Sequence, residues 1–452
     1  MPDPSNGEIL EVATRIAGWA KDGEQVEAYV TRGRETDIRI HDGGIEQLST
    51  ADSEGVGIRV VADHRQGFAW AGSLDPEVVQ EALGEARDNA SFATPDEFLG
   101  LASPDGVAAA DIDPYDEALA DWSTDRKIDL VMDLERRLRA GDARIRAVEA
   151  ADYGDGMMEA AVATSTGLSS WSRRTVTALS TYVMAGAGDD TQTGFGVSFG
   201  RSPEAVDPES VARDAIHRAT RMLGATKPAS AKLTVVLEPF VSASFLSVLA
   251  STLNGDAVLK GRSLFADRVG EEVAAPFLTL VDDATNPDAS GASRYDAEGL
   301  ASRRTPLIEN GVLTGFLYNT YAARRAGRAS TGSAVRGGFK TGPGCGPRAI
   351  ALTPGDRSQE AIISDIPLGL LVQEVSGLHS GVNPVSGDFS VGAAGLMIRD
   401  GQLAEPVREI TISSTIQRML KGVVAVGNDL EWSFGASCHV TLAMADLSMS
   451  GV

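Results

Sequence analysis

The sequence predicts an α+β protein, with N-terminal and middle units that are α/β meanders and a larger, sheet-rich C-terminal unit. Two observations favour this class. Apolar residues follow helical spacing only in short segments, and most of the remaining chain alternates apolar and polar residues as strands do. The length of 452 residues, at about 150 residues per domain, allows three folding units.

The first unit is expected to span residues 1–95. Apolar residues between Ile9 and Ala20 recur at helical spacing, so a helix is expected there. The Asp42-Gly43-Gly44 turn is suited to a hairpin, and Asp75-Pro76 predicts a helix start because Asp caps a helix and Pro fits its first turn. Strands are expected at 26–32, 36–41, 45–50, 56–62 and 68–71.

Residues 96–115 mix Pro, Asp, Ala and Gly without a period, which predicts a linker before a middle unit at 116–228. In that unit a helix around Leu134 precedes an antiparallel meander, and Asp207-Pro208 opens a closing helix. The meander strands are expected at 145–153, 157–165, 168–184 and 195–199. Gly67-Phe68 and Gly194-Phe195 each precede an Asp-Pro helix start, an echo that duplication and convergent turn chemistry explain equally well.

The third unit is expected at residues 229–452, where glycine and turn residues are frequent. Helices are expected at 240–253 and 412–421. Strands are expected at 233–238, 277–282, 313–319, 395–398 and 440–445.

Composition narrows the classes of partner. The formal net charge is −23, which repels phosphate backbones and argues against a nucleic-acid partner. Two cysteines in so long a chain do not make a disulfide framework, and they fit a reducing cytoplasm. The apolar runs at 233–237 and 367–372 are far shorter than the ~20 residues of a membrane span. We therefore expect a cytoplasmic protein with no membrane contact.

Searches for catalytic and metal-binding motifs identify none in this chain. The five histidines include no pair at zinc-ligand spacing, and neighbouring Cys438 and His439 would point to opposite faces of a strand. The G-x-S-x-G pattern at 196–200 lacks the strand, tight turn and helix that a nucleophile elbow needs. The glycines at 337–338 do not complete a phosphate loop, and the acidic residues at 282–288 depart from the spacing of a calcium loop.

Short segments in a fixed order carry a resemblance that no single motif provides. They include 27–30, 43–46, 55–60, 260–263, 296–299, 308–313, 330–332, 386–390 and 426–430. In their order and spacing these segments resemble the TldD/PmbA family over nearly the whole chain. The resemblance implies a TldD/PmbA domain in each of the three units. It also implies a cytosolic family associated with zinc-dependent processing of unstructured peptides.

The family has two kinds of subunit, which the resemblance implies form a heterodimer. The TldD type carries a His-Glu-x-x-x-His zinc helix and a later cysteine ligand, and the TldE (PmbA) type lacks them. Here Ser247 stands where the first histidine would be, Val248 replaces the glutamate base, and Ser251 or Thr252 takes the place of the second histidine. Serine is a poor zinc ligand and valine cannot accept a proton. We therefore expect the helix to form but to lack zinc binding and general-base activity. Cys438 falls in the final strand pattern and is not given the metal role.

These residues place the chain with the TldE-like subunits. We expect a non-catalytic subunit without cofactor, paired with a TldD-type zinc subunit or with itself, that closes a chamber around unfolded peptide. Two loops are expected to face that chamber, although plain turns would explain them equally well. Their candidate substrate-binding residues are Ser330, Thr331, Gly332, Ser333, Gly377, Ser380 and Asn383. The alternatives are a stand-alone enzyme using His379, His439 or Cys438, and a homodimeric peptide-binding protein.

Overall fold

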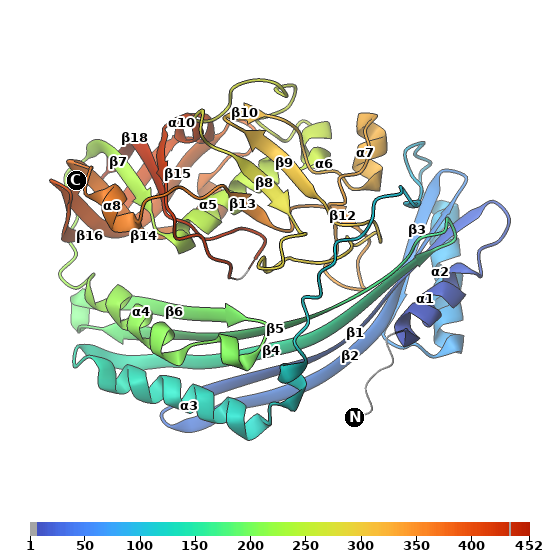
Figure 1. The fold of residues 1–452 in the computed structure, drawn as a ribbon, viewed down its shortest axis with the longest axis horizontal. Coiled ribbons are helices and arrows are strands. Elements are labelled where there is room, and N and C mark those ends of the chain that lie inside the picture. The colour runs from blue at the N-terminus through green and yellow to red at the C-terminus, as the bar shows by residue number, and fades with distance from the viewer. Residues whose placement is uncertain (1–6, 434) are drawn as a thin grey trace.

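The computed structural model describes residues 7–433 and 435–452. A long, curved sheet forms one layer, and a second unit rich in short strands lies over its hollow side (Figure 1). The helices of the first two expected units lie at the two ends of the curved sheet. The α+β class predicted from the sequence is confirmed.

The curved sheet combines strands from the first two expected units. Its order is β3-β2-β1-β4-β5-β6, and every neighbouring pair is antiparallel. Strands β1 and β4 join the two halves through a register that runs from Glu27 opposite Thr164 to Ile40 opposite Ala151. The strands are β1 (Glu24–His41), β2 (Gly44–Ala62), β3 (Arg65–Ala71), β4 (Ile145–Thr164), β5 (Ser169–Ala185) and β6 (Gln192–Gly200).

Several strands are longer than the sequence predicted. The expected strands at 26–32 and 36–41 are one strand, as are those at 45–50 and 56–62 and those at 145–153 and 157–165. The alternation of apolar residues lapses near Gly33 because this stretch of β1 lies between two separate hydrophobic cores. The backbone of β1 stays paired with β2 and β4 on both sides of Gly33. A prediction based only on the alternation of apolar residues therefore divides this one strand into two.

One pair of helices closes each end of the sheet. Helices α1 (Glu8–Ala17) and α2 (Pro76–Phe92) cover one core, and α3 (Thr124–Gly141) and α4 (Pro208–Thr220) cover the other. The expected caps are present, with Asp75 and Asp207 each accepting a hydrogen bond from a first-turn backbone N–H at 2.9 Å. Short 3₁₀ turns lie at Glu117–Asp121, Gly188–Asp190 and Pro203–Ala205.

The two Gly-Phe pairs that precede the Asp-Pro helix starts make the same kind of contact, a strand glycine against a helix, at the two ends of the curved sheet. A side-chain carbon on Gly67 would lie 2.0 Å from the Ala86 carbonyl oxygen of α2. A side-chain carbon on Gly194 would lie 2.2 Å from the Ala215 carbonyl oxygen of α4. Each glycine therefore permits a helix to lie directly on the last strand of its half-sheet.

The segment between the two half-sheets contains no helix or strand from residue 93 to residue 116. It is nevertheless attached to the C-terminal unit. The Tyr321 hydroxyl donates to an Asp96 carboxylate oxygen at 2.7 Å, and Arg324 donates to the Leu101 carbonyl oxygen at 2.6 Å. An ion pair between Arg303 and Asp105 adds a third attachment.

The C-terminal unit is built on a sheet of order β16-β15-β14-β7-β18-β17, and β16 also pairs with β18 to close a ring. These strands are β7 (Ala231–Leu237), β14 (Leu368–Ser376), β15 (Asp388–Arg399), β16 (Gln402–Thr415), β17 (Val423–Val426) and β18 (Leu442–Ser450). A four-stranded sheet contains β8 (Leu280–Asp283), β9 (Arg304–Glu309), β10 (Val312–Leu313) and β13 (Ile350–Leu352), and a hairpin contains β11 (Ala334–Val335) and β12 (Gly344–Cys345). The helices are α5 (Pro239–Thr252), α6 (Gly255–Leu259), α7 (Thr320–Ala326), α8 (Gln359–Ile363), α9 (Leu378–Gly381) and α10 (Ile416–Lys421).

Two expectations for this unit were wrong. Of the strand expected at 313–319, only Leu313 lies in a strand, β10, because Leu317 exchanges backbone hydrogen bonds with the chain just after α5 instead of with a strand. The helix expected from Ile412 begins at Ile416, because Ile412 lies in β16 and the Thr415 side chain caps the helix. Within the described chain, no helix is long and apolar enough to cross a membrane.

Candidate functional site

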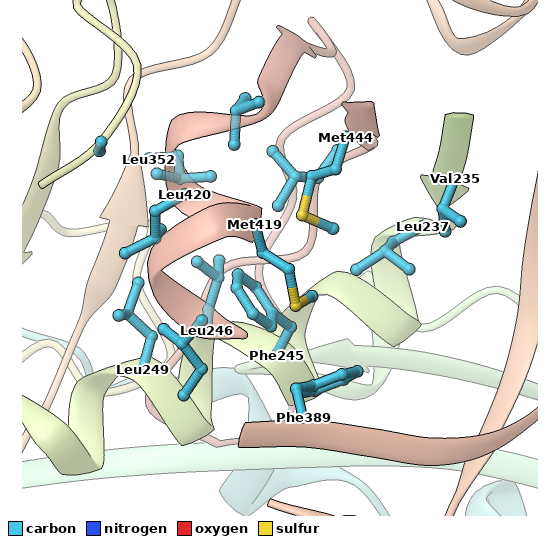
Figure 2. Packing of buried hydrophobic residues seen from close by; sticks show 14 of the residues in the cluster. Val235, Leu237, Phe245, Leu246, Leu249, Leu352, Phe389, Met419, Leu420 and Met444 are labelled. Carbon is cyan, nitrogen blue, oxygen red and sulfur yellow. The ribbon is translucent and has the colours of Figure 1, made fainter. Parts of the chain in front are cut away.

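Helix α5 is the helix at which the sequence placed the degenerate zinc motif. Glu238 precedes it as the N-cap, and Pro239 occupies its first turn. Its inner face carries Phe245 and Leu249, which are 2% and 0% exposed and pack beneath α10 (Figure 2). The Phe245 ring meets Phe389 of β15 edge-on at 6.1 Å between centroids. The inner face therefore anchors α5 in the C-terminal core.

The outer face of α5 carries three of the four degenerate positions. Ser247 and Ser251 are exposed, Val248 is half-buried, and Thr252 instead turns into the core. The Ser247 hydroxyl donates to the Ala243 carbonyl oxygen at 2.9 Å, and the Ser251 hydroxyl donates to the Val248 carbonyl oxygen at 2.7 Å. These hydroxyls bond to their own helix, and none of the three side chains is a carboxylate, imidazole or thiol.

This outer face does not suit a zinc ion. A zinc site needs closely grouped imidazole, thiolate or carboxylate ligands, and the oxygen 3.1 Å from the Ser247 hydroxyl belongs to another serine, Ser437. Among the residues that the structure describes, no three His, Cys, Asp or Glu side chains form a possible metal-binding group. No reaction step through zinc is derived for this chain.

Aromatic side chains join the start of α5 to the curved sheet. Phe240, in the first turn of α5, stands 4.5 Å from Phe195 of β6 between ring centroids, and Phe195 stands 6.2 Å from Tyr182 of β5. The His439 ring also meets Phe240 edge-on, at 5.7 Å between ring centroids. Tyr182 is 53% exposed and Phe240 is 40% exposed, so part of this row faces solvent. The row has no local signal in the sequence, since its members are scattered from residue 182 to residue 439.

Ionic contacts hold the same junction together. Glu238 pairs with Arg221, the C-cap of α4, and a nitrogen of Arg218 within α4 lies 3.9 Å from the second carboxylate oxygen of Glu238. The Arg218 guanidinium also lies over the Phe195 ring at 4.4 Å. These contacts hold the start of α5 against α4 and β6, and Figure 1 shows α5 in the unit that lies over the curved sheet.

The loop at 330–333 is packed within the protein. Ser333 is 1% exposed, and the Thr331 hydroxyl oxygen lies 2.8 Å from the Ser333 hydroxyl oxygen and accepts from the Tyr318 backbone N–H at 2.7 Å. The Ser330 hydroxyl donates to the Tyr318 carbonyl oxygen at 3.1 Å. Gly332 has φ +67°, and an added side chain there would lie 2.7 Å from the Ala301 carbonyl oxygen. The hydrogen bonds of this loop are therefore largely internal.

The loop at 377–383 is an exposed turn around α9. Gly377 has φ +77°, Ser380 donates its hydroxyl to the Gly377 carbonyl oxygen, and both Ser380 and Asn383 are exposed. The Asn383 side-chain oxygen accepts from two backbone N–H groups of the following turn at 2.9 and 3.2 Å. Its neighbours differ from those of the 330–333 loop, so a shared role of the two loops in peptide binding stays a prediction.

The three residues of the stand-alone enzyme alternative occupy different surroundings. His379 lies on α9, whereas His439 packs against Phe240 and Cys438 lies in the core, ahead of β18 rather than within it. Burial raises the pKa of the Cys438 thiol to about 11 and that of the Cys345 thiol to about 12, which keeps both protonated at neutral pH.

A buried charge cluster joins the curved sheet to the C-terminal unit. Glu27 of β1 contacts Arg59 of β2 at 2.5 Å and also pairs with Arg336. Arg59 lies 3.5 Å from Glu298, which accepts from the Thr320 backbone N–H at 2.9 Å. The four ionic side chains are 0–5% exposed. Burial would raise the pKa of Glu27, but Arg336 and Arg59 outweigh it and hold the pKa below its ordinary value.

Asp296 lies beside this cluster in a similar environment. It accepts three backbone N–H bonds, from Glu298 at 2.9 Å, Leu300 at 3.0 Å and Ala334 at 3.1 Å. Burial, together with the negative charge of Glu298, raises the pKa of Asp296 to about 7, although Arg348 acts in the opposite direction. The sequence singled out residues 296–299 only as a resemblance segment, and the structure places them where the two units meet.

Three segments of the chain match the domain models of a known protein family. Models of the PmbA/TldA metallopeptidase match domain 1 at residues 26–90, the central domain at residues 117–223 and the C-terminal domain at residues 230–451. The chain belongs to the PmbA/TldD metallopeptidase family. The family resemblance predicted from the sequence is therefore confirmed.

Relatives named PmbA and a relative named TldD are both similar to this PmbA/TldD chain. The metalloprotease PmbA of Escherichia coli O157:H7 is 27% identical over 447 residues, covering 98% of this chain and 96% of the relative. A metalloprotease TldD homologue of Haemophilus influenzae is 27% identical over 413 residues, covering 88% and 84%. Overall identity, at 27% to each, therefore does not place this chain with PmbA rather than TldD.

Solved structures share the whole fold. A candidate modulator of DNA gyrase from Bacteroides thetaiotaomicron superposes with a TM-score of 0.89 at 25% identity, covering 100% of both chains. TldE from Thermococcus kodakarensis superposes with a TM-score of 0.86 at 24% identity, covering 94% of this chain and 97% of that one. The second likeness concerns the fold alone.

Proposed function

We propose that this chain is the zinc-free, TldE-like subunit of a PmbA/TldD-type peptidase that processes unstructured peptides in the cytoplasm. The observation that carries the proposal is the outer face of α5. At the positions of the family's zinc helix it presents Ser247, Val248 and Ser251, which supply neither a zinc ligand set nor a general base. The inner face of the same helix remains a core element.

The work left to such a subunit is architectural. Its α5 face and the aromatic row from Tyr182 to Phe240 form one wall of a chamber whose zinc belongs to a TldD-type partner. Exposed serine hydroxyls and half-exposed rings suit an extended peptide, because they offer hydrogen bonds and apolar contact without selecting one side chain.

The test combines this chain with the TldD-type protein of the same organism. We expect the two to co-purify with one zinc per heterodimer. Cleavage of an unstructured peptide is expected only from the mixture and is expected to stop in a chelator. The matched control is the same mixture with the glutamate of the partner's zinc helix replaced by glutamine, which should assemble but not cleave. The proposal is overturned if this chain alone holds one zinc and has chelator-sensitive peptidase activity, or if it forms only a dimer of itself.

A further inference from the structure

The outer edge of β2 is unpaired over half of the strand. Strand β1 pairs with one side of β2 along its whole length, but β3 pairs with the other side only from Val56 to Ala62. Every residue from Gly44 to Glu54 is exposed. Within the described chain, no strand or isolated bridge pairs with this outer edge. The 11 residues of Gly44–Glu54 span about 36 Å.

An edge of this kind presents backbone donors and acceptors suited to another strand. Natural proteins commonly protect such edges with bulges, short strands or covering loops. The pairing of β1 with β2 shifts register only between Arg39 and Ile40, next to the hairpin turn, and is regular from Gln47 onward. The edge is therefore long and regular enough to accept an extended segment by strand addition.

The side chains on this edge indicate the charge of the segment. Glu46, Asp52 and Glu54 lie on it, and no lysine or arginine occurs from residue 44 to residue 58. On the inner side, Arg32 approaches Glu54 at 3.5 Å and Arg34 approaches Asp52 at 3.7 Å. All four side chains are 31–64% exposed, so these pairs contribute little and leave the acids open to an incoming strand.

A second copy of the same edge fits poorly. Two copies pairing symmetrically about Ser49 would place Glu46 opposite Asp52, and pairing about Thr50 would place Glu46 opposite Glu54. Directly opposed like charges destabilise an antiparallel pair. The acids thus disfavour self-association and favour a strand that carries basic residues.

Two apolar side chains supply further contact area. Ile45 is 49% exposed and Leu48 is 48% exposed, and they stand in register with Ile40 and Ile38 of β1. Side chains alternate between the two faces of a sheet, so Leu48 lies on the same face as Asp52 and Glu54, and the aliphatic stems of lysines on that face can pack on it. An occupant with basic residues at alternate positions therefore matches this edge in backbone and charge, and its lysine stems supply the apolar contact.

We propose that the outer edge of β2, residues 44–54, binds an extended basic peptide as an added strand. This proposal rests on the proposed function, since it assigns to a peptidase subunit a recruitment site for unstructured substrate in addition to the α5 face. The edge selects for an unfolded backbone and for positive charge, without a demand for one sequence.

The test measures binding of a fluorescein-labelled ten-residue peptide that alternates lysine and valine to the isolated chain. Two altered peptides accompany it, one with glutamate in place of lysine and one N-methylated at every second residue. We expect each alteration to weaken binding at least tenfold, the first through charge and the second through lost backbone pairing. Equal binding of the N-methylated peptide would show ion pairing without strand addition and would overturn the proposal.

A charge-reversed variant locates the site. Glu46→Lys/Asp52→Lys/Glu54→Lys is expected to weaken binding of the lysine peptide at least tenfold while the melting temperature stays close to that of the natural protein, because all three residues are exposed. Unchanged binding by this variant would overturn the proposal.

The control makes the same change in net charge on the exposed face of α2, as Glu81→Lys/Glu85→Lys/Asp88→Lys. It is expected to alter binding by less than twofold, and a loss equal to that of the edge variant would overturn the proposal. Hydrogen exchange on the natural protein supplies a measurement that needs no variant. The bound peptide should slow exchange of amides within residues 44–54, and protection confined to other segments would overturn the proposal.

These measurements use the isolated chain, so they separate the recruitment site from the proposed function. If the lysine peptide does not bind but the heterodimer still cleaves short peptides, the edge proposal fails and the subunit role stands. If the peptide binds at β2 but no TldD-type partner associates, the subunit role fails and the edge proposal stands as a property of the fold.

Discussion

Replacing Glu27 with glutamine tests whether the buried charge cluster holds the two layers together. The carboxylate of Glu27 is fully buried and pairs with Arg59 and Arg336, whose side chains are 5% and 1% exposed. Glutamine keeps the shape but leaves two buried guanidinium groups without their shared counter-charge. Breaking a buried pair costs about 3–5 kcal/mol of unfolding free energy, and we expect Glu27→Gln to lie near about 3 kcal/mol because the amide oxygen still accepts one hydrogen bond.

Urea unfolding at pH 7 measures this loss. The matched control is Glu54→Gln, which removes a 44%-exposed carboxylate 3.5 Å from Arg32 and should cost below about 1 kcal/mol. Because the folded pKa of Glu27 is lowered, its stabilisation is present above the ordinary glutamate pKa and is lost as the pH falls. The difference between Glu27→Gln and the natural protein should therefore shrink in acid. Equal effects of the two substitutions at pH 7 would refute the role given to the cluster.

Three further predictions concern α5 and Asp296. Phe245→Asp should lower the unfolding free energy by several kcal/mol because it buries an unpaired carboxylate. The control Ser251→Asp, on the exposed face of α5, should change the unfolding free energy by less than about 0.5 kcal/mol. Equal melting temperatures of the two variants would contradict the packing of Figure 2. Ser247→His/Val248→Glu should yield no peptidase activity in the isolated chain, since the other ligands remain absent, and chelator-sensitive cleavage would disprove this. The folded pKa of Asp296 is raised to about 7, so the folded chain binds a proton that the unfolded chain releases at lower pH. The unfolding free energy should therefore decrease as the pH rises from about 4 to about 7, by up to about 1.4 kcal/mol per pH unit. Asp296→Asn should make this decrease smaller, as measured by urea unfolding at several pH values.

Several elements could be predicted from residues that are close together in the sequence. The Asp-Pro starts of α2 and α4 and the turn at 42–44 depend on residues within a few positions of each other, and they form as predicted. The four residues that the sequence assigns to a degenerate zinc helix do lie on one helix, α5, while their correspondence to zinc-helix positions stays a prediction. Their division into an outer face and one buried residue, Thr252, became visible only in the folded helix.

Elements without a local burial pattern were predicted poorly. The middle of β1 near Gly33 is covered by neither core, so alternation disappears where the strand continues. Strand β14 was not predicted at all, because it is a largely apolar run enclosed between β7 and β15. The aromatic row at Phe240 escaped detection for a different reason, since its rings come together only after three distant segments have packed.

The family, the α+β class and the helix starts at Asp75-Pro76 and Asp207-Pro208 could be read from the sequence alone, because they depend on residue identity and near-neighbour spacing. The folded structure was needed to show that β1 and β4 join two half-sheets, that Glu27 and Arg59 meet Glu298 and Arg336, and that one edge of β2 is left open. These features pair residues more than 100 positions apart or depend on where a neighbouring strand ends. Pairings of that kind follow from the packing of the whole chain, which no local spacing encodes.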